Sequence, residues 1–170
     1  MKYINNEKGN ISIYHVIVIF IFLGMAALAI DYGSLYMNNK LIKEGLNRAV
    51  KAAALAIQED EQLAEGVFTI DPLRAEINFK QILAVNIGLN EITLEPLSTG
   101  SMVTEKPEIR EFIVHNITPT TYYSSVLANY FTLEYPSVLA VVRVKVKGVF
   151  SSRTFTLYKM SSSQLMSVYD

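Results

Sequence analysis

The sequence contains no cysteine, and this absence removes several kinds of chemistry together. Without a thiol there is no disulfide, no thiolate metal site, no cysteine nucleophile and no acylated lipoprotein cysteine. An excess of one charge is also missing, because 15 Lys and Arg residues face 16 Asp and Glu residues and leave a formal net charge of -1. A nucleic-acid-binding face needs a strong basic excess, so we expect no nucleic acid partner.

Familiar catalytic motifs are missing as well. The chain has no HExxH, no GxSxG, no phosphate loop, no dinucleotide glycine pattern and no calcium loop. Of its two histidines, His15 lies near one end of an apolar run, where its ring can reach lipid head groups, and a buried proton-transfer or helix-pairing role is the alternative. His115 has no second ligand near it in the sequence and is read as a hydrogen-bonded structural residue. We therefore expect no enzyme activity, no cofactor and no metal site.

The most informative feature present is a long run without charge. Residues 11–30 contain no Asp, Glu, Lys or Arg, and as a helix they would span about 30 Å, the thickness of the hydrocarbon layer of a bilayer. The run predicts a transmembrane helix in the lipid bilayer, with Lys8 and Asp31 as its boundary residues. Lys2 and Lys8 in the leader, residues 1–10, favour a cytoplasmic N-terminus and an extracytoplasmic C-terminal domain.

A cleavable secretory signal is the alternative interpretation of this run. Residues 27–29, Ala-Leu-Ala, resemble a signal peptidase site. However, the apolar core of a signal is usually about 7–15 residues long, and here the run is longer and is followed by a helix-compatible sequence. The length favours a membrane anchor.

Helical spacing continues beyond the apolar run. Apolar residues recur at intervals of three, four and seven from Leu35 to Ile57, which predicts a helical stalk over residues 31–66. If residues 11–58 form one helix, it is about 72 Å long. Small and apolar positions along it predict a surface for packing against other helices; they are Gly24, Ala29, Gly33, Leu46, Ala49, Val50, Ala53 and Ile57. For the membrane part, plain helix propensity and a lipid-facing surface remain an equal alternative.

The rest of the chain predicts a small domain over residues 67–160, so that the whole is α+β. A short strand is expected over 67–70, and a helix is expected to start at Asp71 and Pro72, end near Gly88 and present Leu73, Ile77, Ile82 and Leu83. Strands are expected over 91–97, 109–118 and 138–150, the last with one buried and one wet face, and a hairpin partner over 153–160. Residues 121–135 are expected to be a loop or short helix, and residues 161–170 a loosely held tail.

Three segments of the N-terminal third carry a family resemblance. They are Lys8-Gly9 before the apolar run, DYGSLY at 31–36 and LNRAVKAAALA at 46–56. In this order they resemble the tight-adherence pilus-assembly proteins of the TadE/TadG-like type, over residues 7–58. The resemblance implies a pilin-like architecture and a place in the cytoplasmic membrane or in a surface filament. It also implies partners among other pilin-like or Tad-machinery membrane proteins and copies of the same chain.

The leader departs from the pattern of pilin-like precursors. In those precursors a peptidase cuts after a Gly that precedes the apolar segment, and the fifth mature residue is commonly Glu. Cleavage between Gly9 and Asn10 would place Tyr14 at the fifth position. The departure bears on cleavage and on incorporation as a major filament subunit.

Two functional hypotheses follow. In the first, the chain is a non-enzymatic component of a pilus or secretion assembly and acts by lateral packing of its long helix. In the second, it is an extracytoplasmic binding or sensor module that the helix merely tethers. Substitutions on the helix, such as Ala53→Arg or Ala29→Leu, are expected to disrupt an assembly only under the first.

Overall fold

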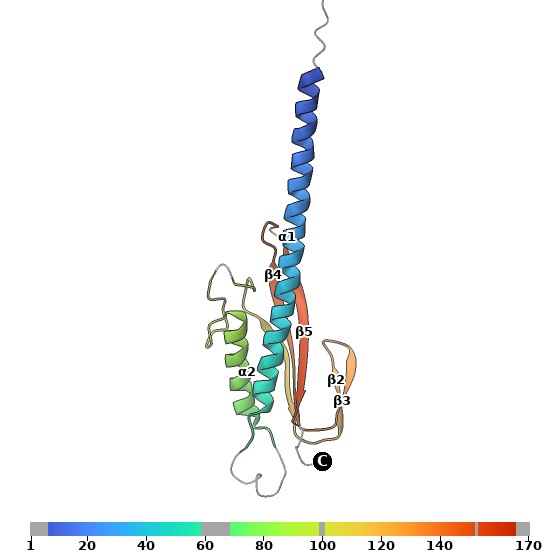
Figure 1. Cartoon of the computed structure of the whole chain (residues 1–170). Helices are drawn as coiled ribbons and strands as arrows, with labels where there is room; N and C mark the ends of the chain where they lie inside the picture. The colour runs from blue at the N-terminus through green and yellow to red at the C-terminus, as the bar shows by residue number, and fades with distance from the viewer. Residues whose placement is uncertain (1–6, 59–68, 99–100, 152, 166–170) are drawn as a thin grey trace, which may run out of the picture.

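The computed structural model describes residues 7–58, 69–98, 101–151 and 153–165, with side chains from residue 13 onward. The fold is α+β, with one long apolar N-terminal helix and a small sheet domain (Figure 1). The elements, in chain order, are α1 (Glu7–Ala54), α2 (Pro72–Ile87), β1 (Glu108–His115), β2 (Thr120–Ser124), β3 (Asn129–Leu133), β4 (Ser137–Lys147) and β5 (Thr154–Gln164).

Helix α1 is continuous for 48 residues, about 72 Å at the usual rise per residue. It ends at Ala54 and does not continue as a stalk to residue 66. Just beyond it, Ile57 forms a β-bridge with Ile70, and the amide of Asp71 donates to the carbonyl of Ala56. The helix stops because these backbone groups are used to turn the chain back toward α2. The acidic run 59–61, Gly66 and the first two residues of the strand expected over 67–70 lie outside the described residues.

Helix α2 has the predicted bounds. The Asp71 carboxylate accepts hydrogen bonds from the amides of Leu73 and Arg74, Pro72 occupies the first turn, and Gly88 ends the helix with φ 75°. The predicted apolar face is wrong in part, since Leu73 is 70% and Ile77 49% exposed. Of the predicted residues, Leu83 is buried and Ile82 is partly buried against the core. The helix also buries Ala75, Phe79, Ala84 and Ile87, because Phe79 has the larger apolar surface to remove from water.

The sheet has three antiparallel strands in the order β1-β4-β5, with β4 in the centre. The predicted hairpin of β4 and β5 is confirmed, but β5 continues to Gln164, so the expectation of a loose tail from residue 161 is wrong. Ser161 to Ser163 pair with Ala140, Leu139 and Val138. A serine-rich segment becomes a strand here because the buried central strand offers it a complete set of backbone partners.

Two other local expectations were wrong. Residues 121–135 form most of the β2–β3 hairpin. Their Thr and Tyr residues favour strands and could have indicated it. Residues 91–97 form no strand; the Asn90 side chain accepts from the amides of Ile92 and Thr93, and this local capping favours a turn. The alternation predicted for β4 holds only near its end, where Arg143 and Lys145 are half-buried, because both faces of its first half are covered.

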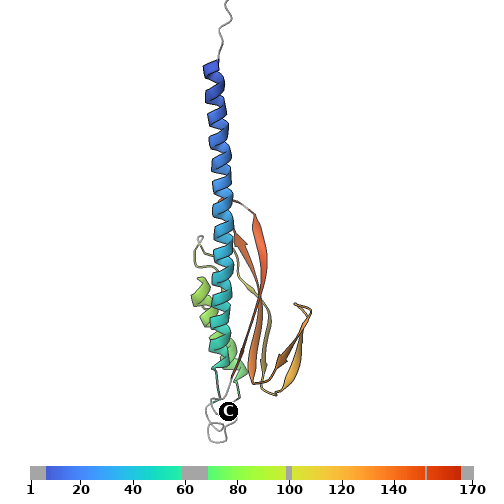
Figure 2. The same ribbon diagram turned by 45° about the vertical axis from the view of Figure 1, so that its right-hand side comes forward.

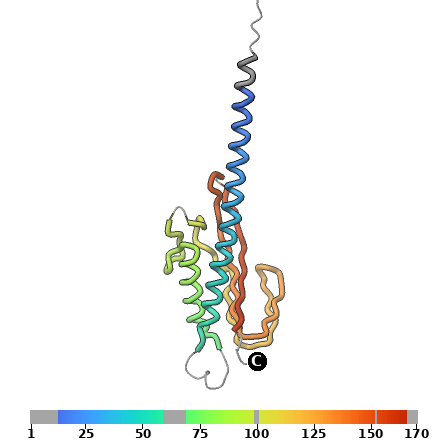
Figure 3. The backbone as a smooth tube through the Cα atoms, viewed as in Figure 1, coloured from blue at the N-terminus to red at the C-terminus, as the bar shows by residue number. Residues whose placement is uncertain are grey.

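The core lies between α1, α2 and one face of the sheet. The second half of α1 supplies Ile42, Leu46, Ala49, Val50 and Ala53, all fully buried. Figures 1 and 2 both place the β2–β3 hairpin on the opposite side of the sheet from α1. The first half of α1 extends beyond the domain, and no other described segment runs beside it (Figure 3).

Candidate functional site

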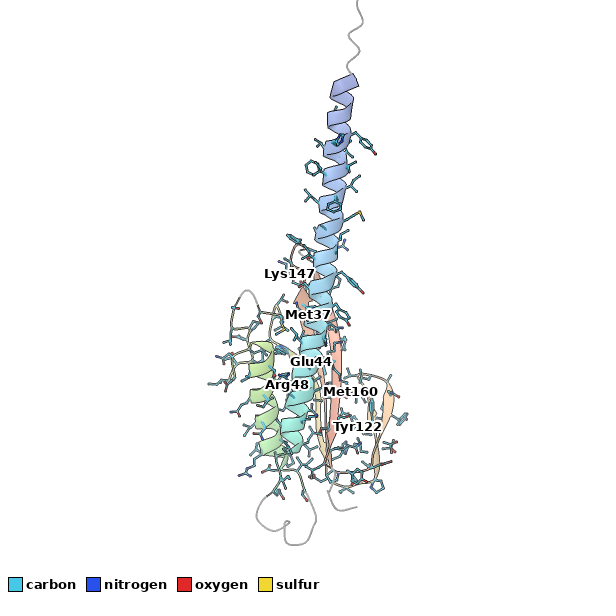
Figure 4. All side chains as sticks on the ribbon, viewed as in Figure 1. Met37, Glu44, Arg48, Tyr122, Lys147 and Met160 are labelled. Atoms are coloured by element: carbon cyan, nitrogen blue, oxygen red, sulfur yellow. The ribbon has the colours of Figure 1, made fainter. Side chains whose placement is uncertain are left out.

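The projecting half of α1 exposes an apolar surface on all sides. Its large apolar side chains between Ile13 and Ile30 range from 45% exposed at Val18 to 72% at Phe22 and Leu28. Figure 4 shows them pointing outward around the helix axis. Exposing this much apolar area to water is unfavourable at roughly 25 cal/mol per Å². The length and composition of this helix fit a membrane anchor or a signal sequence.

The two ends of this segment were predicted from charge. Lys8, Gly9 and Asn10 fall within the first residues of α1, which begins at Glu7, and their side chains lie outside the described part of the chain. Within the helix, the ring of His15 stands edge-on to Tyr14, with 6.3 Å between ring centroids.

Asp31, at the other boundary, has a structural role that its position in the sequence did not reveal. Its Oδ1 accepts a hydrogen bond of 2.6 Å from the amide of Phe150, and its Oδ2 accepts one of 2.7 Å from the amide of Ser151. The residue is only 7% exposed although it lies at the base of the free half of α1. Gly148 fits against it, since a Cβ there would lie 2.9 Å from the Asp31 carboxylate. Asp31 therefore fixes the loop between β4 and β5 to α1.

The eight predicted helix-packing residues divide into two groups. Gly24, Ala29 and Gly33 are exposed on the projecting part of α1 and at its base. The others are not available to a neighbouring helix: Leu46, Ala49, Val50 and Ala53 are 0% exposed in the core of the same chain, and Ile57 lies beyond the helix in its bridge with Ile70. The prediction of an external packing surface on these five residues is therefore wrong. The apolar spacing was real, but α2 and the sheet of the same chain cover that side.

The exposed residues also lie on different sides of α1. Gly24 precedes Asp31 by seven residues and so lies on the side that faces the domain. Gly33 follows Asp31 by two residues, about 200° around the helix, and Ala29 is four residues before Gly33. A Cβ at Gly33 would meet nothing within 4 Å. Ala29 and Gly33 thus form a small-residue strip that points away from the domain.

An apolar groove lies between α1 and the sheet near the same end of the domain. It has a volume of about 390 Å³ and is lined by Tyr32, Leu35, Tyr36, Asn39, Val146, Phe155 and Leu157. Tyr32 is 76% and Tyr36 64% exposed. Exposed aromatic side chains gather here next to the predicted lipid boundary, where amphipathic rings are favoured.

The polar side chains of the domain mostly serve its own structure. Arg143 donates to Glu108 over 2.7 Å and Lys145 pairs with Glu105 over 2.6 Å, so two of the cations predicted on the wet face of β4 are ion-paired. The Arg143 hydrogen bond holds the pKa of Glu108 below its usual value. Ser161 donates to the side chain of Asn47 on α1. These pairs hold the sheet against its neighbours, and the hydroxyl of Ser161 is engaged in one of them.

Glu111 attaches the β2–β3 hairpin to β1. Its carboxylate accepts from the hydroxyls of Ser124 and Ser125 and from the amide of Val126, over 2.6, 3.2 and 3.1 Å. Burial alone would raise the pKa of Glu111, but these hydrogen bonds outweigh burial and lower it. The carboxylate is therefore a structural anion, satisfied by three donors.

His115 packs against Tyr122, with 5.3 Å between ring centroids, and burial lowers its pKa. Its buried Nε2 has no hydrogen-bond partner within the described residues, so the expected hydrogen bond is missing at this atom. In the same described part of the chain, no three His, Cys, Asp or Glu side chains are placed to hold a metal ion. His115 is thus a packing residue of the β1–β2 junction.

The candidate functional site is therefore the projecting half of α1 together with the Asp31-bound loop at its base. The exposed apolar side chains of this surface are not part of the domain core. No protein-family model, no curated protein and no solved structure matches the chain.

Proposed function

We propose that the chain is a single-pass membrane protein that takes part in assembling a tight-adherence-type pilus or a related secretion machine. One observation carries this proposal: a single unbroken helix has its second half buried in its own domain and its first half exposed and apolar throughout. A helix built in this way joins a rigid domain to lipid without a flexible linker. The architecture is pilin-like in that sense, in agreement with the motifs of residues 7–58.

The orientation follows from the leader and from the position of the domain. Lys2 and Lys8 favour retention of the N-terminus in the cytoplasm, so the sheet domain is extracytoplasmic. Helix α1 passes through residues 27–29 without interruption, which supports an anchor over a cleaved signal. The protein therefore resides in the cytoplasmic membrane, from which a filament could recruit it.

Assembly occurs through lateral contacts of the projecting helix. In lipid, helices associate where small residues let their backbones approach closely. The strip of Ala29 and Gly33 meets this condition, and the domain does not obstruct it, because the domain packs on the Asp31 side. The role is structural and not enzymatic, and the partners are other pilin-like or Tad-machinery membrane proteins or further copies of this chain.

Site-specific crosslinking tests the proposal, because the chain has no cysteine of its own. A photocrosslinker is attached in native membranes to Ala29→Cys or Gly33→Cys, and to Gly24→Cys on the domain-facing side. Ile92→Cys, on a residue 93% exposed in the domain, is the control for collisions. We expect adducts with a second copy or with another single-helix membrane protein at Ala29 and Gly33, few at Gly24 and none at Ile92.

The alternative function, a tethered binding or sensor module, predicts a different result. If no position between residues 13 and 33 yields protein adducts while the chain remains in the membrane, the helix only tethers the domain. Equal yields at Ala29 and Gly24 would contradict the proposed packing side.

A further inference from the structure

Residues 148–151, the first part of the loop between β4 and β5, lie at a defined height along α1. The amides of Phe150 and Ser151 bind Asp31, the first residue after the apolar run. The contact is tight, since Gly148 leaves no room for a Cβ beside the carboxylate. If residues 11–30 occupy the hydrocarbon layer, as in the proposed function, the β4–β5 loop lies at the level of the lipid head groups.

The side chains of this loop are apolar and uncovered. Val149 is 60% and Phe150 64% exposed, and both extend from backbone that Asp31 holds against α1. An exposed Val-Phe pair on a fixed loop is an unusual feature for a water-facing turn, where small and polar residues dominate. Because this pair lies beside the end of the apolar run, it fits a surface that the bilayer around that run also covers.

Basic side chains flank the apolar pair. Lys147 ends β4 and Arg153 precedes β5, and both are exposed. Figure 4 places Lys147 at the end of the domain from which the free half of α1 emerges. Apolar residues between cations form the pattern of a segment that lies in the interface of an anionic bilayer, with the apolar side chains among the upper acyl chains and the cations among the phosphates.

We propose that the tip of the β4–β5 hairpin is a second membrane contact of this protein. Val149 and Phe150 enter the interfacial layer of the same bilayer that holds α1, and Lys147 and Arg153 meet its anionic head groups. A bilayer is favoured over a protein partner, because insertion of α1 already brings the bilayer next to Asp31 and the loop that it binds. This inference rests on the membrane-spanning role assigned to α1 above.

The second contact has a consequence for assembly. A single helix can tilt and rotate in a bilayer, and its orientation is set by interfacial anchors and by its neighbours. The loop lies on the Asp31 side of α1, so its insertion keeps that side of the helix next to the domain and restricts rotation of the helix in the bilayer. The opposite strip of Ala29 and Gly33 is then turned toward incoming helices.

Tryptophan fluorescence tests the proposal, because the native chain contains no tryptophan. The full-length chain is prepared with a single Phe150→Trp substitution in vesicles of phosphatidylcholine and phosphatidylglycerol, with and without acyl chains brominated near the glycerol. Tyr130→Trp, at a 69% exposed position of the β2–β3 hairpin, is the matched control. Phe20→Trp, in the middle of the apolar run, reports separately on the anchor in vesicles whose acyl chains are brominated near their methyl ends, at the depth of that residue.

We expect Trp at position 150 to emit at shorter wavelength than Trp at position 130 and to lose intensity with the brominated lipid, while Trp at position 130 keeps its intensity. Adding Lys147→Gln to Phe150→Trp should reduce the loss in vesicles that contain phosphatidylglycerol. Quenching at position 20 without quenching at position 150 overturns the second contact and leaves the anchor intact. A short-wavelength emission at 150 that bromine does not quench also overturns it, since protein then covers the loop. Absence of quenching at position 20 removes the anchor, and with it both proposals.

Discussion

At the residue scale, Asp31 connects two parts of the chain that are far apart in the sequence. A carboxylate after an apolar run is ordinarily a charge at the membrane boundary, but here it satisfies two backbone amides from a loop almost 120 residues later in the chain. Two charge-assisted hydrogen bonds to one side chain define both the position and the orientation of that loop.

Replacing Asp31 should therefore loosen the β4–β5 loop. Asp31→Ala leaves the amides of Phe150 and Ser151 without their acceptor, so we expect their hydrogen exchange to accelerate, while exchange in α2 stays unchanged. Hydrogen–deuterium exchange of the detergent-solubilised chain measures this. Ser34→Ala, one turn along α1, is the control and should leave the loop protected. Unchanged protection in Asp31→Ala would show that strand pairing alone holds the loop.

At the scale of elements, the two halves of α1 lie in different environments. Its second half meets α2 closely at Gly45, where a Cβ would lie 2.9 Å from Ile87 Cγ2 and 3.1 Å from Asn86 Cβ. At Gly33, on the outer side, the same atom would meet nothing within 4 Å. Ala53 belongs to the buried half, so Ala53→Arg would place a charge in the domain core and would test folding instead of assembly.

The two glycines offer a matched pair of substitutions. Gly45→Leu should lower the free energy of unfolding by about 1–3 kcal/mol, because α1 and α2 must separate to accept the side chain. Gly33→Leu has the same change in helix propensity without a clash, so it should leave stability unchanged or slightly increased and reduce crosslinking at Ala29. Denaturant unfolding in detergent, with crosslinking in membranes, separates the two effects. Equal destabilisation by both variants would contradict the assignment of Gly33 to the outer side.

At the scale of the whole molecule, the domain and the projecting helix contribute to different properties. The core uses residues of α1 from Ile42 onward, with Leu35 packed against it, while the large side chains before Asp31 remain exposed. The projecting half therefore adds little to the stability of the domain, and under the proposed function it determines where the domain is held.

Removing the projecting half should leave the domain folded. We expect a chain of residues 31–170 to stay in solution without detergent and to keep the unfolding midpoint of the full-length chain, while its helical circular dichroism falls only by the contribution of the helical residues removed. The full-length chain should require detergent or lipid. If the full-length chain were monomeric in plain buffer, α1 would not be a membrane anchor; if residues 31–170 were unfolded, the first half of α1 would contribute to the core.

The sequence by itself determined the elements whose causes are local. The uncharged run specified a long exposed helix, Asp71-Pro72 and Gly88 specified the bounds of α2, and the alternation of Val with Arg and Lys indicated β4 and its hairpin. These features depend on neighbours a few residues apart, so they can be read along the chain.

Only the tertiary structure decided which groups cover the apolar side of α1. The spacing of Leu46, Ala49, Val50 and Ala53 predicted a packing surface correctly but could not say whether the partner was another molecule or the chain's own α2 and sheet. The serine-rich end of β5 and the loop bound to Asp31 depend on partners far away in the sequence. Burial and hydrogen bonding are satisfied by whichever groups the fold brings near, and that choice is made only when the whole chain packs.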